Sequence, residues 1–345
     1  MFDELALAIL LLLGGGAAMV ILVVGLQMTA LADRIADRTG LGEAVVGGVL
    51  LGAATSFSGT VVSFTAALDG RESLAFSNGI GGIAAQTAFL AIADIVYRRA
   101  NLEHAAAELA NVFQCGVLLA LLAIPIAAVT APEFAVFGVH PASFLLVVVY
   151  AFGVAATARI REKPMWHPVQ TDETRADEPE DGDTPDNPAR WLILGFLFLM
   201  AVLGTAGWVI SQVGAQLVDR LEISASLVGA LVTAVITSLP ELVTTIAAIR
   251  RGALQLAIGG IIGGNTFDTL FLTISDIGYR DGSIYHAVGP QDLFWLATGM
   301  LMTTILMLGL IFRQKKGPGS IGLESLVLLC IYALAIAVQA VSASS

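Results

Sequence analysis

The stretch I-T-S-L-P-E at 236–241 places a proline and a carboxylate inside an apolar run, 227–249. Such a run is typical of a membrane-spanning helix, because about 20 apolar residues cross the hydrocarbon layer. Pro240 has no amide hydrogen, and its ring clashes with the carbonyl of Ile236 four residues earlier, so we expect the helix to open here. Open backbone at membrane depth is tolerated only where it lines a cavity or is buried in protein.

This break gathers oxygen atoms. Thr237 and Ser238 contribute hydroxyls, Glu241 contributes a carboxylate, and the opened turn frees backbone carbonyls. Such oxygen ligands are those that hard cations, for example sodium and calcium, bind in proteins. An ionisable residue at membrane depth is costly and usually functional. The stretch therefore predicts a cation site within the membrane.

Composition places the rest of the chain in the same setting. The 345 residues are 57% hydrophobic and 13% charged, with a mean hydropathy of +0.84, which excludes a soluble fold. Cys115 and Cys330 lie in apolar runs, and the four histidines have no metal-ligand spacing, so we assign them no chemistry. Hydropathy and helix breakers predict ten spans, at 4–31, 43–68, 73–97, 106–130, 141–158, 190–218, 225–249, 254–277, 288–312 and 320–341.

The predicted spans fall into two halves joined by an acidic segment. Eight acidic residues lie between Asp172 and Asp186, among prolines and few apolar residues. We therefore predict a disordered linker at 159–190, between a first five-helix half at 1–158 and a second at 191–345. Fourteen of the seventeen basic residues fall in loops on one side. This split predicts a multi-pass protein of the cell membrane with both termini outside and the linker in the cytoplasm.

An internal repeat relates the two halves. Residues 41–98 align with 223–280 without a gap, at a constant offset of 182, and twenty of the fifty-eight positions are identical. Chance similarity between two apolar runs does not explain shared polar residues at a fixed offset. The copies start five spans apart, so they cross the membrane in opposite directions, as in secondary transporters. The predicted fold is an all-α membrane protein with ten transmembrane helices in two inverted five-helix repeats.

The second copy carries two motifs, T-S-L-P-E-L-V-T-T-I at 237–246 and G-G-I-I-G-G-N-T-F-D at 259–268. They resemble the G-T-S-L-P-E-like break and the G-N-x-x-G-S-N-x-F-N/D-like helix of the calcium/cation antiporter superfamily, the sodium/calcium exchangers. The resemblance implies alternating access, with the first and sixth helices as the gating pair. It also implies a site in which Glu241 is the central carboxylate and Asp268 the second acid, with hydroxyl or backbone ligands from Thr237, Ser238, Thr55 and Ser56.

The first copy departs from the family pattern. The family's proline, glutamate and amide or carboxylate partner fall on Ser58, Gly59 and Gln86, and its second-helix serine falls on Gly82 and Gly264. Two acids can balance one divalent ion, or two monovalent ions or protons, so calcium specificity stays open. Asp94 and Asp276 lie at helix ends beside Arg98 and Arg280, and we interpret them as structural charges at the membrane interface.

We therefore predict a secondary active antiporter, not an enzyme, that exchanges sodium or protons for another cation at a midplane site. It needs no cofactor besides the transported cations, which include sodium and calcium among the candidates. Its expected partners are inorganic cations and the lipid bilayer, not nucleic acid, and a homo-oligomer stays open. The alternatives are a sodium or potassium/proton antiporter that has lost calcium specificity, a membrane sensor that binds cations without moving them, and a channel, which fits an inverted repeat less well.

Overall fold

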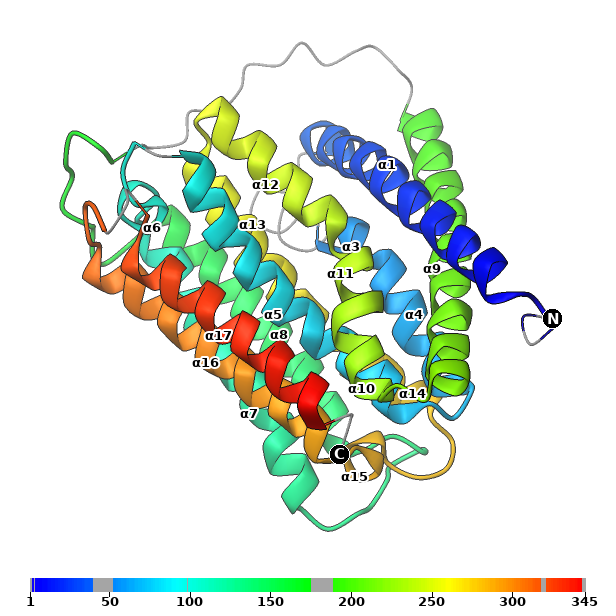
Figure 1. Ribbon diagram of the computed structural model, residues 1–345. Helices are drawn as coiled ribbons and strands as arrows, with labels where there is room; N and C mark the ends of the chain where they lie inside the picture. The colour runs from blue at the N-terminus through cyan, green and yellow to red at the C-terminus, as the bar shows by residue number, and fades with distance from the viewer. Residues whose placement is uncertain are drawn as a thin grey trace.

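The computed structural model describes residues 2, 4–39, 52–97, 99–174, 189–317 and 321–342, and these are almost entirely helical (Figure 1). The first half contains α1 (Leu7–Thr39), α3 (Gly52–Thr55), α4 (Phe57–Leu68), α5 (Glu72–Tyr97), α6 (Leu102–Ala105), α7 (Leu109–Thr130) and α8 (Pro141–Glu162). The second half contains α9 (Ala189–Leu221), α10 (Ala225–Leu227), the π-helical turn η2 (Val228–Thr233), α11 (Ala234–Thr237), α12 (Leu239–Arg251), α13 (Leu254–Asp268), α14 (Leu270–Gly278), α15 (Ile284–Ala287), α16 (Pro290–Phe312) and α17 (Leu323–Ser342).

The described helices confirm an all-helical, multi-span membrane protein. Eight of them are long and apolar enough to cross a membrane, and the bent pair Ala225–Thr237 and Leu239–Arg251 makes a ninth if it is one span. The predicted span 43–68 begins outside the described residues and continues as α3 and α4. The count of ten therefore stays a prediction. The start of the repeat at 41–51 and the acidic residues from Asp177 to Asp186 also lie outside the described residues.

The offset of 182 extends well beyond the aligned segment. Helices α1 and α9 begin at Leu7 and Ala189 and end at Thr39 and Leu221. The short helices α6 and α15 and the long helices α8 and α17 also start 182 residues apart. Element boundaries thus recur over nearly the whole of each half, beyond the segments 41–98 and 223–280 that align in sequence.

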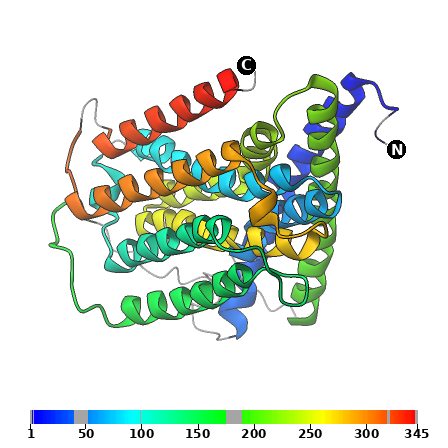
Figure 2. The same cartoon turned by 90° about the horizontal axis from the view of Figure 1, so that it is seen from below.

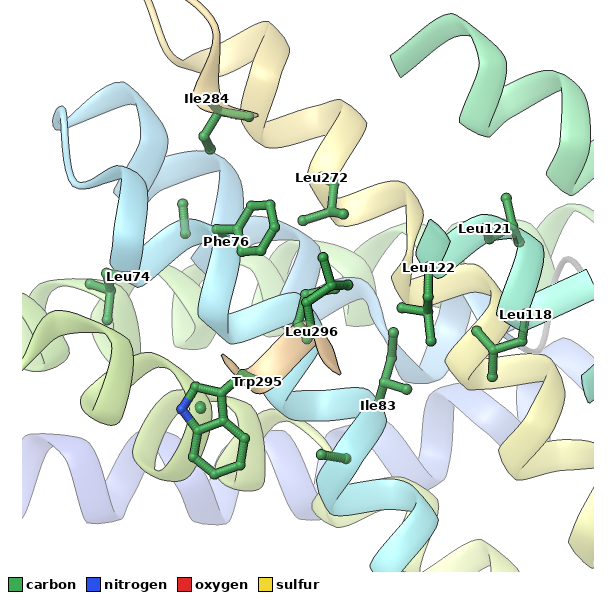
Figure 3. Close-up of a cluster of buried hydrophobic side chains, with 14 of the residues drawn as sticks. Leu74, Phe76, Ile83, Leu118, Leu121, Leu122, Leu272, Ile284, Trp295 and Leu296 are labelled. Atoms are coloured by element: carbon green, nitrogen blue, oxygen red, sulfur yellow. The ribbon is translucent and has the colours of Figure 1, made fainter. Parts of the chain in front are cut away.

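Helix α5 lies at the centre of the bundle. Its side chains are buried from Leu74 to Asp94 on nearly every face, because it packs against α4, α13, α16 and α17. Seen from below, α17, α16, α7 and α8 follow one another across the molecule (Figure 2). Leucine, isoleucine and aromatic side chains of α5, α7, α14 and α16 pack against one another in a hydrophobic core (Figure 3). Such a core fixes the depth of every polar group on α5 and α13.

Asp94 and Asp276 have the structural role that we expected, but they are fully buried within the protein. Oδ1 of Asp94 accepts from the backbone N–H of Leu102, and its Oδ2 accepts from Gly322. In the same way, Asp276 accepts from the N–H groups of Ile284 and His140. The donors correspond at the repeat offset of 182, Leu102 to Ile284 and His140 to Gly322. Each aspartate therefore caps one helix of its own half and one of the other half, because the first N–H groups of a helix need acceptors.

The described start of the linker is held against the helix ends. The Arg313 guanidinium donates to the Val169 carbonyl and to the Thr174 hydroxyl. Lys315 forms an ion pair with Glu173 (Nζ to Oε1, 2.6 Å), which holds the pKa of that carboxyl below its usual value. We expected this whole segment to be disordered on composition alone. Basic residues after α16 give its first part a docking site.

Candidate cation site

Two helix breaks bring the predicted hydroxyl ligands to the centre of the bundle. The second break falls at Ser238, with φ −95° and ψ 3°, and bends the helix by 46°. The first break falls at Ser56, with φ −88° and ψ 4°, between α3 and α4. The first break has Ser58 at the position that corresponds to Pro240. A missing proline N–H therefore does not explain the first break. The expected opening at Pro240 is confirmed by the bend at Ser238, and the first break shows that a helix of this chain also opens without a proline.

Each break is crossed by a glycine of a long outer helix from the opposite half. A β-carbon at Gly25 of α1 would lie 2.6 Å from Cγ of Pro240. A β-carbon at Gly207 of α9 would lie 2.6 Å from the carbonyl oxygen of Ser58. These two pairs are related by the offset of 182. Helices α1 and α9 also pack along each other (Figure 1), so the pair covers both breaks with no room for side chains between.

Glu241 and Asp268 lie side by side in the interior. Glu241 is in the first turn of α12 and is 4% exposed, and Asp268 ends α13 and is 2% exposed. Glu241 faces Asp268 and the hydroxyls of Thr55 and Ser56, and Ser56 also lies beside Asp268. The two acids of the second half are therefore joined by hydroxyls of the first half.

Gln86 completes this group from α5. Its Nε2 donates to Oδ2 of Asp268 (2.7 Å) and to Oγ of Ser238 (3.1 Å). Gln86 and Asp268 are repeat equivalents, so equivalent positions meet at the centre of the molecule. The amide takes the place of an acid and uses both of its hydrogens as donors to the site.

Glycines at Gly82 and Gly264 leave space beside these groups. A β-carbon at Gly82 would lie 3.4 Å from Oδ2 of Asp268 and 3.6 Å from Oγ of Ser238. A β-carbon at Gly264 would lie 3.1 Å from Oε1 of Gln86. Both positions face the site, and neither brings a hydroxyl to it.

Several buried oxygens at this point make no hydrogen bond of regular geometry within the described part of the chain, although hydroxyls lie beside them. They are Oε1 and Oε2 of Glu241, Oδ1 of Asp268, Oε1 of Gln86 and Oγ of Ser56. Buried polar atoms without a partner are rare and require an explanation. Convergent carboxylate, amide and hydroxyl oxygens form a ligand set for a hard cation. In the part of the chain that the structure describes, no three acidic, histidine or cysteine residues gather as metal ligands, so any such set rests on neutral oxygens as well.

The predicted residues do not contribute equally. Thr55, Ser56, Ser238, Gln86, Glu241 and Asp268 form one connected group. The hydroxyl of Thr237 instead donates to the carbonyl of Ala234 and lies 3.4 Å from a β-carbon position at Gly59. That position is also 2.7 Å from the ring of Phe271. An aromatic ring thus packs against the site where the first half lacks a glutamate.

Three polar residues near the site were not predicted. Asn265 donates to the Thr87 hydroxyl, and Asn78 donates to the carbonyl of Gly59. Tyr150 packs edge-on against Phe267, with ring centroids 6.0 Å apart. It also lies within electrostatic range of Asp268. Asn265 stands inside the quoted 259–268 motif and could have been included. Asn78 and Tyr150 occur in no motif and are found only through packing.

Comparisons with known proteins show which family the chain resembles. The family model described as "Sodium/calcium exchanger protein" matches residues 7–159 and 191–341. The chain is 27% identical over 302 residues to the "Putative antiporter CaxA" of Alkalimonas amylolytica, covering 86% of the chain and 89% of that protein. It is 30% identical over 149 residues to the inner membrane protein YrbG of Escherichia coli, over 43% of each.

Solved structures share the fold at low sequence identity. A structure of the sodium-calcium exchanger NCX_Mj soaked with Na⁺ and Sr²⁺ superposes with a TM-score of 0.60 and 18% identity, covering 94% of this chain and 98% of that one. The structure of native YfkE superposes with a TM-score of 0.61 and 13% identity, covering 94% and 91%. At these identities the likeness concerns the fold.

Proposed function

The chain belongs to the sodium/calcium exchanger protein family, and we propose that it is a secondary active cation antiporter with one central site. The site consists of Glu241 and Asp268 with neutral oxygens from Thr55, Ser56, Thr237, Ser238 and Gln86. The observation that carries the proposal is the convergence of buried carboxylate, amide and hydroxyl oxygens that make no regular hydrogen bond in the described part of the chain. A bound cation would satisfy all of them at once.

The charge of the site limits what it can carry. Two carboxylates balance one divalent ion, or two monovalent ions or protons, and an interior of low dielectric penalises any excess charge. Exchange follows if each cargo needs the same carboxylates, because the second ion can enter only after the first has left. We propose sodium or protons on one side of this exchange, with calcium as a candidate for the other.

Alternating access would come from movement of α1 and α9 over the breaks. The glycine contacts at Gly25 and Gly207 are smooth surfaces over which a helix can slide without interlocking side chains. We propose ten spans in two inverted repeats, 1–158 and 191–345, because the exchanged caps and crossing glycines relate the halves at one offset. The linker side is then cytoplasmic, by the distribution of basic residues.

Counterflow in proteoliposomes tests the proposal. Vesicles are loaded with unlabelled calcium, sodium or potassium, or set at a different internal pH, and uptake of labelled calcium or sodium is followed outside. An antiporter accumulates label only when a transportable cation is present inside. A sensor binds label without uptake, and a channel equilibrates label without an internal counter-ion, so either result would remove the proposal.

A further inference from the structure

Three buried carboxyl groups meet on the linker face, far along α5 from the cation site. Asp94 ends the buried part of α5, Glu103 lies in α6, and Glu324 lies in the first turn of α17. Asp94 and Glu103 are fully buried, and Glu324 is 7% exposed. The carboxyl of Glu103 lies beside that of Glu324 and within electrostatic reach of Asp94.

The group is tightly enclosed. A β-carbon at Gly322 would lie 2.7 Å from Oε1 of Glu324 and 3.3 Å from Oδ2 of Asp94. Both carboxyls therefore lie next to Gly322. A β-carbon at Gly309 would lie 2.8 Å from Cγ of Glu324. Gly309 at the end of α16 and Gly322 before α17 thus leave the space in which the Glu324 side chain points inward, toward Glu103.

The carboxyls differ in their donors. Asp94 accepts from two backbone N–H groups, whereas among the described residues neither oxygen of Glu103, nor Oε1 of Glu324, has a donor in hydrogen-bonding geometry. Donors favour the charged form of a carboxyl, and burial without donors favours the neutral form. The backbone donors therefore favour the charged form of Asp94, and the proton belongs on Glu103, whose carboxyl lies beside that of Glu324.

The opposite face shows that the fold does not require these acids. At the offset of 182, Glu103 corresponds to Tyr285, whose hydroxyl bonds to Ser143 (2.8 Å), and Asp94 corresponds to Asp276. The histidine beside each is retained: His104 contacts the carbonyl of Arg313, and His286 contacts that of Ala131, again 182 apart. The same junction is built there with a single acid and a neutral phenol.

Among the described residues, the charged groups that act on Glu103 are the carboxyls of Asp94 and Glu324. Helix α13 carries only Asp268 and α16 only Asp292, each at the end away from this face. The Arg313 guanidinium donates to the carbonyls of His104 and Val169, and Lys315 pairs with Glu173. Burial, with added repulsion from Asp94 and Glu324, raises the pKa of Glu103 well above its ordinary value.

We propose that Glu103 and Glu324 form a proton-binding site, separate from the central cation site, through which the pH of the linker face controls transport. With the proton bound, the α6, α16 and α17 ends pack closely around α5. When the proton leaves, two carboxylates repel each other beside Asp94 in a site of low dielectric, and the junction loosens. Since Asp94 and Gln86 share α5, this change reaches the helix that holds the cation site.

The pH dependence follows in sign. The folded chain keeps the Glu103 proton above pH 4.5, the ordinary value, whereas the unfolded chain loses it. The free energy of unfolding therefore falls as pH rises from there to the raised pKa of the folded state. We expect Glu103→Gln, which stays neutral at every pH, to raise the melting temperature more at pH 8 than at pH 5.

The primary test is infrared spectroscopy of the full chain in lipid. At neutral pH the difference spectrum of wild type minus Glu103→Gln should show a protonated carboxyl C=O band that disappears on alkalinisation, and Glu324→Gln should shift the pH at which this band is lost. The exposed Glu162→Gln serves as the matched control, and the band should also persist in Asp268→Asn, which separates this site from the central one. This readout requires no transport, so it stands or falls apart from the proposed function.

The second test is cation flux against pH on the linker face. Wild-type flux should fall as the pH rises through the range in which the band is lost, and Glu103→Gln should remove that fall. Tyr285→Phe, the equivalent position on the opposite face, should leave it unchanged. A difference spectrum with no such band, a band lost at the same pH in Glu324→Gln as in the wild type, or a flux profile that Glu103→Gln does not flatten would each overturn the proposal.

Discussion

The two helix breaks have nearly the same backbone conformation but very different side chains. Ser56 and Ser238 both depart from the helix with ψ near zero, although only the second break has Pro240 and Glu241. The first has Ser58 and Gly59 at those positions. Packing of the outer helices over each break, and not proline, is what the two share. The halves thus contribute equally to the shape of the site and unequally to its charge.

The largest effect should come from removing that charge. We expect Glu241→Gln and Asp268→Asn each to abolish cation flux in proteoliposomes, because each removes a charged ligand while preserving volume. Glu162→Gln and Asp281→Asn, both exposed, are the matched controls. Asp94→Asn is unsuitable as a control because its two oxygens cap two helices. Wild-type flux in both site variants would show that the charge of the second half is not used.

A smaller but substantial loss should follow Gly25→Ala. The added methyl group must displace the Pro240 ring, and overpacking of this kind costs about 1–3 kcal/mol. We expect slower flux with unaltered equilibrium cation binding, since the contact lies between α1 and the break. Gly16→Ala on the same helix has no neighbour within 4 Å and should transport normally. Equal flux in the two variants would argue against movement at this contact.

Selectivity should shift if the missing carboxylate is restored. Gly59→Glu alone would collide with the Phe271 ring, so the informative variant is Gly59→Glu with Phe271→Ala. A third carboxylate favours a divalent ion, and we expect tighter calcium binding by calorimetry than in Phe271→Ala alone. Gly59→Gln with Phe271→Ala separates charge from size. If the glutamate and glutamine variants bind calcium equally, charge at this position does not set selectivity.

The smallest effect should come from Pro240→Ser, which copies the first break into the second. If packing opens the helix, the bend at Ser238 persists and flux falls only modestly, by loss of the ring contact with Gly25. Distances between spin labels on α10 and α12, measured by electron paramagnetic resonance, would report the bend. A straightened helix in this variant would show instead that proline causes the second break.

Sequence reasoning reached the site because Glu241 and Asp268 are carboxyls in apolar runs, and the resemblance to the exchanger family assigned them and Gln86 to one site. The offset of 182 relates Gln86 to Asp268, and the two side chains are hydrogen-bonded in the structure. The Phe271 ring beside Gly59 could not be predicted, because an apolar side chain in an apolar helix carries no signal of its partner. The burial of Asp94 was missed for a related reason: its partners are backbone N–H groups, which every sequence position offers.

Glu103 shows the same limit from the other side. It lies in a short loop helix where an acid is ordinarily solvated, and the packing of α5, α13 and α16 around that helix makes it interior. The start of the linker is similar, since its composition suits disorder while Arg313 and Lys315 lie far away in sequence. Local composition describes what a segment can do alone and not what covers it.

The exchanged aspartate caps also bear on how the chain is assembled during synthesis. The first turn of α8 receives its acceptor from Asp276, which is made more than a hundred residues later (Ser143 and Asp276 are 133 apart). The first half therefore leaves the ribosome with only the His140 side chain accepting at the start of α8, whereas Asp94 is already present to accept from Gly322 when α17 is made. Neither half is a finished folding unit in the bilayer. Each is completed by the other, as in two subunits that recognise one another through identical contacts.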